Sequence, residues 1–93
     1  MRFLQFAIPE GFAAAAAEAA ALIAGGATLL QGLGLWVNEG EVERERVGWL
    51  IVGVEEGKKD EVIQQIKEIL RKGGERAIFF VEDGKAKLEW LED

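Results

Sequence analysis

The two halves of this chain repeat one pattern of hydrophobicity and glycine placement, and this repetition limits the folds open to it. An apolar run at residues 3–8 is echoed by another that begins at Trp49, and each run leads into a segment with helical periodicity. Both helical segments end in a glycine pair, Gly25-Gly26 and Gly73-Gly74, which is typical of a helix C-terminus. A further strand-like run follows each pair, so each half predicts a strand, a helix and a strand.

Two such units in tandem predict a ferredoxin-like β-α-β-β-α-β arrangement, here with an extra C-terminal strand. We therefore expect an α+β fold in which an antiparallel sheet carries two helices on one face. With 93 residues, the chain suits a single domain that spans residues 1–93. The expected strands are residues 3–8, 27–37, 41–54, 77–81 and 85–91, and the expected helices are residues 10–24 and 58–72.

Both predicted hairpin turns end in glycine, in Asn38-Glu39-Gly40 and in Glu82-Asp83-Gly84. Three-residue hairpin loops often carry glycine at a left-handed bulge position, which would pair Val37 with Glu41 and Val81 with Lys85. In the second hairpin this register predicts one largely apolar face and one face that carries the charges. The apolar face would hold Ile78, Phe80, Ala86, Leu88 and Trp90, and the other face Phe79, Lys87 and Glu89.

The two predicted helices differ in composition. The second is amphipathic, whereas the first is mostly alanine and is interrupted on its outer face only by Glu18. We expect its core stripe to be Phe12, Ala15, Ala16, Ala19, Leu22 and Ile23, which leaves an outer face of alanines that includes Ala17. A helix that is apolar all round usually packs on two sides, so Ala17, together with Trp36 near a hairpin tip, marks a candidate oligomer interface. The alternative is that alanine is present as the best helix former.

The missing residue types exclude several functions. Without cysteine or histidine the chain has no thiolate or imidazole ligand, and we expect no metal site and no cofactor. Serine and tyrosine are absent as well, so only carboxylates, lysines and Thr28 could act as acid, base or nucleophile, and we expect no catalytic residue and no enzyme. A formal net charge of −6 argues against nucleic acid or an anionic membrane as a partner.

Two segments were candidates for targeting or membrane insertion. The apolar run at residues 3–8 is too short for the core of a signal peptide, and residues 11–30 are too rich in glycine and alanine for a transmembrane helix, so we expect a cytoplasmic protein. The chain uses few residue types and is rich in Glu, Ala, Gly, Leu and Lys. Such a composition is typical either of a thermostable protein or of a designed or redesigned sequence. Composition does not separate these two origins.

From Gly26 onward the chain resembles the PII signal-protein family and its relative CutA. The resemblance rests on a strand that carries Gly32-x-Gly34, on the return strand at residues 47–54, on the helix from Lys58 and on the strand within residues 74–81. The tight turn after this first strand is more similar to the long hairpin of CutA than to the mobile loop of PII.

The resemblance implies a trimer built on ferredoxin-like sheets. It does not extend to the basic residues that hold nucleotide phosphates in PII proteins. Arg76 lies one residue from the place of a lysine, and Glu89 falls among positions that would carry arginines.

A candidate ligand site consists of Gly32, Gly34, Arg44 and Arg46. With a three-residue loop, Gly34 would lie opposite Arg44 and Gly32 opposite Arg46, all on one face. Glycines within a strand often mark the close approach of a ligand, and two guanidinium groups over bare backbone suit a phosphate or carboxylate. The alternative is structural, with the arginine stems covering Trp36 and their charges pairing with glutamates.

The sequence thus favours a non-enzymatic, self-associating PII/CutA-like domain. A small anionic ligand such as a nucleotide, bound between subunits, is a candidate partner. The alternative is a designed scaffold or assembly module that only folds and assembles and has no natural ligand.

Overall fold

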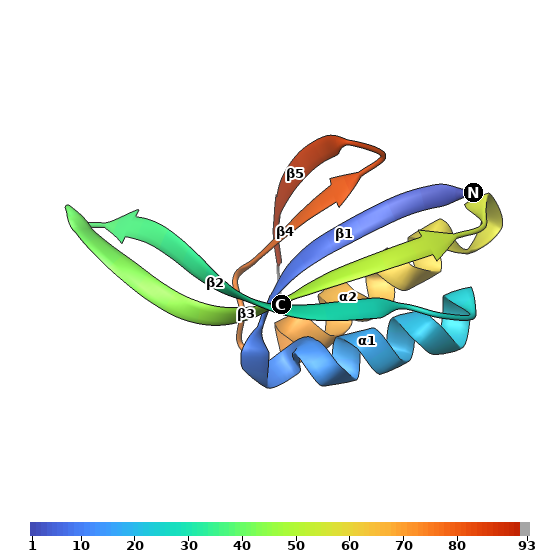
Figure 1. Cartoon of the computed structure of the whole chain (residues 1–93), viewed down its shortest axis with the longest axis horizontal. Coiled ribbons are helices and arrows are strands. Elements are labelled where there is room, and N and C mark those ends of the chain that lie inside the picture. Colours follow the sequence, from blue (N-terminus) through green and yellow to red (C-terminus); the bar gives the residue numbers. More distant parts are fainter. Residues whose placement is uncertain (92–93) are drawn as a thin grey trace.

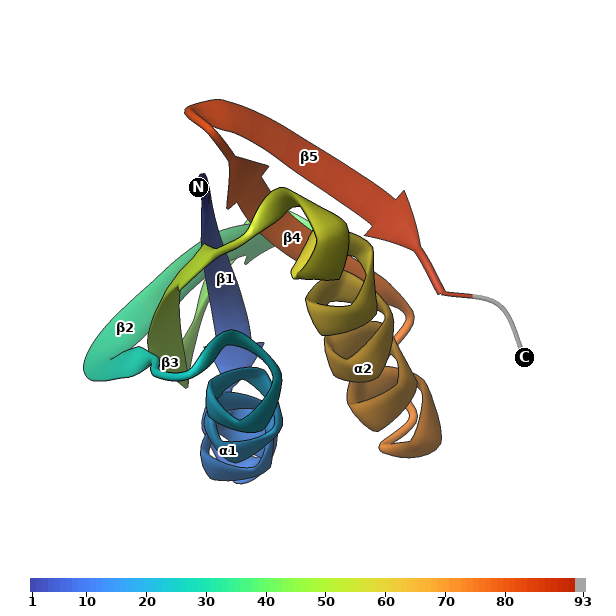
Figure 2. The ribbon, with the colours of Figure 1, turned by 90° about the vertical axis from the view of Figure 1, so that its right-hand side faces the viewer.

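A computed structural model describes residues 1–91 as one five-stranded antiparallel sheet that carries two helices on one face (Figures 1 and 2). The strand order is β2-β3-β1-β4-β5, so β1 is central and β2 and β5 are the edges. The elements are β1 (Arg2–Pro9), α1 (Glu10–Ala24), β2 (Thr28–Asn38), β3 (Glu41–Val54), a 3₁₀ turn (Glu56–Lys58), α2 (Lys59–Lys72), β4 (Ala77–Glu82) and β5 (Lys85–Trp90).

The predicted fold class is confirmed, and each helix and strand begins and ends within one residue of its expected bounds. Gly25 takes a left-handed φ of 95° at the end of α1, where its N–H donates to the Ala21 carbonyl at 2.8 Å. Successive side chains of β1 point to opposite faces of the sheet, so Leu4, Phe6 and Ile8 are buried beneath the helices.

The core lies between the sheet and the two helices. Phe6 of β1 and Phe80 of β4 are both buried and stack with their ring centroids 5.5 Å apart. The amphipathic α2 covers them with Val62, Ile63, Ile66 and Leu70.

The face of α1 that meets the core differs from the expected one. Ala13, Ala16 and Ala20 are buried, whereas Leu22, expected in the core stripe, is 88% exposed. Ala17, expected on the outer face, packs against the core. The reason is a close approach to β3, because a Cβ added at Gly48 would lie 2.5 Å from the Cβ of Ala13. Only small side chains fit between the helix and this strand, so the alanines rather than the leucine face the sheet.

Both hairpin turns are one residue shorter than expected. Glu39 and Gly40 have φ values of 53° and 81°, and Asp83 and Gly84 have φ values of 48° and 85°. Two successive left-handed residues make the two-residue turn that matches the twist of a hairpin. Asn38 therefore pairs with Glu41, and Glu82 with Lys85.

This one-residue difference changes which residues share a face, because side chains alternate along a strand. In the second hairpin Phe79 pairs with Leu88 and Ala77 with Trp90, which places the apolar residues of β5 on the sheet face away from the helices. Lys85, Lys87 and Glu89 share the helix side with Ile78 and Phe80. The predicted grouping of Ala86, Leu88 and Trp90 with Ile78 and Phe80 is wrong.

Within residues 1–91, neither helix has the length and hydropathy that a membrane crossing requires.

Candidate functional site

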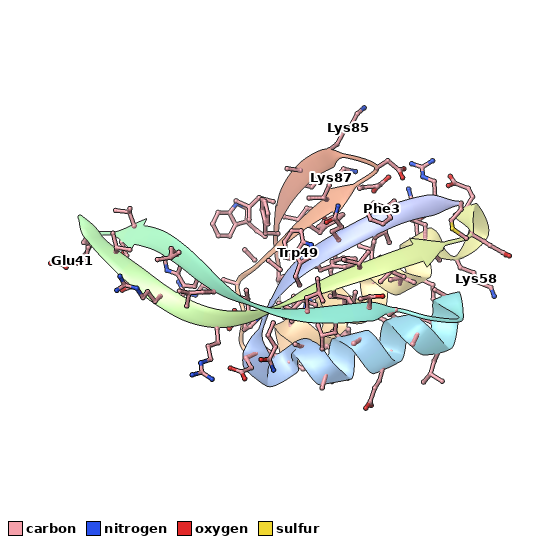
Figure 3. The ribbon with its side chains drawn as sticks, in the orientation of Figure 1. Phe3, Glu41, Trp49, Lys58, Lys85 and Lys87 are labelled. Carbon is pink, nitrogen blue, oxygen red and sulfur yellow. The ribbon has the colours of Figure 1, made fainter. Side chains whose placement is uncertain are left out.

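The distal part of the β2–β3 hairpin, residues 33–46, stands clear of the rest of the molecule, and we call it the arm (Figure 1). β1 pairs with β3 only as far as Val47, so among residues 1–91 the two strands beyond this point pair only with each other. Figure 3 shows Glu41 at the tip of the arm, far from Lys58 at the opposite end of the molecule.

The structure does not bring the four predicted ligand residues together on one face. Gly34 lies opposite Glu45, and Arg44 lies opposite Leu35. The two glycines therefore belong to the face away from the helices, and the two arginines to the helix side. The predicted anion site is therefore wrong, because it assumed a three-residue loop at residues 38–40, whereas the turn has two residues.

Gly34 makes room for an aromatic ring of the arm itself. A Cβ added there would lie 3.1 Å from Cζ3 of Trp36, so the indole extends across the bare backbone. The indole N–H of Trp36 donates to the Glu43 carboxylate at 3.2 Å, and the Asn38 side-chain amide donates to the same carboxylate at 3.2 Å. The glycine therefore serves the packing of Trp36, which remains 43% exposed.

The two faces of the arm carry charges of opposite sign. Glu41, Glu43 and Glu45 lie with Trp36 on the face away from the helices, which we call the acidic face. Arg44 and Arg46 lie on the helix side, which we call the basic face, among exposed apolar side chains of both strands. These are Leu33, Leu35, Val37 and Val42.

A hollow of ≈ 260 Å³ lies where the base of the arm meets the start of α1. Its lining includes Gly32 and Arg46 from the predicted site, together with Glu10 and Gln31. Gly34 and Arg44 do not line it. Because Glu10 shares the hollow with Arg46, the local charge is mixed rather than positive.

The sheet face away from the helices, which we call the open face, is largely apolar. Trp90 on β5 is 72% exposed and Leu88 is 59% exposed. The open face continues through Phe79, Phe3 and Leu30, each of which is exposed on a different strand. Trp49 also lies there, and its indole N–H donates to Gln5 at 2.9 Å. No element within residues 1–91 covers this surface (Figure 2).

Glu82 is the centre of a charged cluster that the sequence analysis did not identify. Its carboxylate accepts hydrogen bonds from Lys59 at 3.0 Å, Lys87 at 3.1 Å and Arg2 at 3.1 Å. The hydrogen bonds from Lys59 and then Lys87 lower the pKa of Glu82 from 4.5 to about 2. The cluster joins β1, α2, β4 and β5 and therefore has a structural role. The alternation Ile78, Phe80, Glu82 was the signal, because it places a carboxylate on the core side of β4.

No protein-family model and no curated protein matches the chain. Among solved structures, a point mutant of CutA1 from Pyrococcus horikoshii OT3 has a similar fold, with a TM-score of 0.62 and 18% sequence identity over 100% of this chain and 85% of that one. A phage SAM lyase in complex with S-methyl-5′-thioadenosine gives a TM-score of 0.61 at 11% identity over 96% of this chain and 87% of that one. The lyase in its apo state gives 0.58 at 13% identity over 99% and 89%. These likenesses show that the chain has a ferredoxin-like fold similar to that of CutA1.

Proposed function

We propose that the chain is a non-enzymatic, self-associating domain that works as a closed homo-oligomer, with a trimer as the assembly. The arm carries this proposal. An isolated two-stranded hairpin is marginally stable in water, yet this one extends clear of the core with apolar side chains on both faces. Val37, for example, is 71% exposed. A second copy of the chain that covers the arm would account for both features.

The sheet offers two further surfaces for the same assembly. Its open face presents Trp90, Leu88 and Phe79 to solvent, and aromatic side chains of this kind are enriched in protein interfaces. Its edge strand β2 has no charged residue between Thr28 and Asn38. Uncharged edges of this length pair readily with another strand, whereas the lysines of β5 protect the opposite edge.

We expect multi-angle light scattering of the wild-type protein to give about three times the 10.2 kDa mass of the chain. Leu35→Glu should lower this mass, because it replaces an exposed apolar side chain of the arm with a charged one that the contact would have to desolvate. Leu22→Glu is the matched variant on the outer face of α1 and should leave the mass unchanged. A wild-type monomer at high micromolar concentration contradicts the proposal. If only Leu22→Glu loses assembly, the interface lies on α1 and not on the arm.

An anionic ligand between subunits is the second candidate role, and the hollow beside Arg46 is the observation that favours it. If the hollow binds such a ligand, titration calorimetry with ATP should give a heat of binding that Arg46→Ala removes. A non-enzymatic protein incubated with S-adenosylmethionine should release no S-methyl-5′-thioadenosine, as measured by mass spectrometry. Release of this product would contradict the non-enzymatic assignment. Absence of a binding heat with ATP would favour a scaffold that only folds and assembles.

A further inference from the structure

The arm separates its charges by face, and within residues 1–91 these charges form no ion pair. Residues 41–46 alternate Glu and Arg or Val, so Glu41, Glu43 and Glu45 point one way while Arg44 and Arg46 point the other. Charges of like sign follow each other along each face at a spacing of about 7 Å. The partner strand does not neutralise them, because Arg44 faces Leu35 and Arg46 faces Leu33.

The charges at the arm also lack partners elsewhere in the described chain. Among residues 1–91, no carboxylate lies within ion-pair distance of Arg44 or Arg46, and no cation lies within that distance of Glu41 or Glu45. Glu43 differs, because its carboxylate accepts hydrogen bonds from Trp36 and Asn38. Like charges about 7 Å apart along one exposed face repel each other weakly in water, so a surface of opposite charge is a favourable partner for each face.

We infer that the arms of neighbouring copies stack face to face, with the acidic face of one copy against the basic face of the next. This inference rests on the proposed self-association and specifies how it is directed. In such a contact each carboxylate row meets a guanidinium row, while Leu33, Leu35 and Val37 meet Trp36 of the neighbour.

The contact joins two different surfaces, so it is head-to-tail and generates a ring when the rotation closes. A two-fold contact through either face would bring like charges together, which opposes a symmetric dimer. The neighbour's carboxylates would form ion pairs with Arg46. An anionic ligand in the hollow and the neighbouring arm would therefore compete for the Arg46 guanidinium.

Three charge-reversed variants test this contact. The first is Arg44→Glu with Arg46→Glu, which makes both faces acidic. The second is Glu41→Lys with Glu45→Lys, which makes both faces basic and leaves Glu43 in its hydrogen bonds. The third combines all four changes, so that the two faces exchange signs. The control is Lys58→Glu with Lys72→Glu, which matches the first variant in net charge at exposed sites on and beside α2.

We expect the first and second variants to raise the concentration needed for assembly by about tenfold or more, as measured by sedimentation velocity. The combined variant should assemble like the wild type, and so should the control. Circular dichroism and the melting temperature verify that each variant is folded.

The outcomes separate this inference from the proposed function. If the wild type is monomeric, the proposed function fails. If the wild type assembles and the first two variants assemble equally well, self-association stands and the arm contact is wrong. Failure of the combined variant to recover while it remains folded would also contradict the complementary contact, because it preserves the pairing of opposite signs.

Discussion

Alanine in place of Gly48 is expected to lower the free energy of unfolding by about 3 kcal/mol, at the upper end of the cost of overpacking a core. Its Cβ would lie 2.5 Å from the Cβ of Ala13 and 2.8 Å from Cδ1 of Leu29. Leu29 could change rotamer, but Ala13 has no rotamer to change, so α1 itself would have to move away from β3. Urea denaturation followed by circular dichroism measures the loss.

Gly11→Ala is the matched control for this substitution. No heavy atom lies within 4 Å of a Cβ placed at Gly11, in the first turn of α1. There the substitution should raise the stability by about 0.5–1 kcal/mol, because alanine restricts the unfolded chain more than glycine does. Equal effects of alanine at the two positions would refute the close packing of α1 on β3.

Glu82→Gln is expected to lower the free energy of unfolding by about 2 kcal/mol at neutral pH, since it removes the charge from a largely buried acceptor of hydrogen bonds from three cations. The effect should depend on pH. The pKa of Glu82 is about 2 in the folded protein and 4.5 ordinarily, so the folded state favours the ionised form. Its contribution to stability is therefore complete above about pH 4.5 and is lost as the pH falls towards 2.

Urea midpoints measured between pH 7 and pH 2 test this expectation. The wild type and Glu82→Gln should differ most at pH 7, and their midpoints should converge in acid. Glu18→Gln on the exposed side of α1 provides the control, because no ion pair to Glu18 forms within residues 1–91. A difference between Glu82→Gln and wild type that persists unchanged at pH 2 would show that the charge is not the source of the stability.

The order and bounds of the elements could be predicted because the physical signals for them are local. Glycine pairs end the helices, a short apolar run marks β1, apolar residues recur with helical period in α2, and Gly40 and Gly84 mark the turns. Each signal depends on the conformational preference of a few neighbouring residues. The fold class follows from their order, because a strand-helix-strand unit repeated twice has few ways to bury its apolar faces.

The register could not be predicted with the same security. A turn that ends in glycine fits a three-residue loop, which requires one left-handed residue, and also a two-residue loop, which requires two. The structure adopts the second, with Glu39 and Asp83 left-handed, which is uncommon for residues other than glycine. A long-range contact supports this choice at Asp83, whose side chain accepts a hydrogen bond from the Phe3 N–H at 2.8 Å. The residues next to Asp83 in the sequence give no signal of that contact. The β2–β3 hairpin has the same shorter turn, and its pairing register, shifted by one residue, places the four predicted ligand residues on two different faces.

The buried face of α1 also could not be predicted from the sequence of the helix itself. A hydrophobic stripe identifies the buried face of a helix only when its side chains differ in size or polarity, and a run of alanines offers little difference. The deciding residue, Gly48, lies on another strand. The more hydrophobic Leu22 was therefore assigned to the core, although the space there admits only a methyl group.

The sheet order has a consequence for how this chain can fold during synthesis. The two halves that look alike in sequence are interlocked, since β1 pairs with β3 and β4, and β2 pairs with β3. Each ladder that involves β1 or β2 thus joins one half to the other, and a ribosome that has released only the first half has released no paired strand. Sheet formation must wait for β3, and the central strand acquires its second neighbour only when residues 77–82 emerge. The first half produced alone should remain unfolded, whereas the two halves mixed together contain every partner that these strands need.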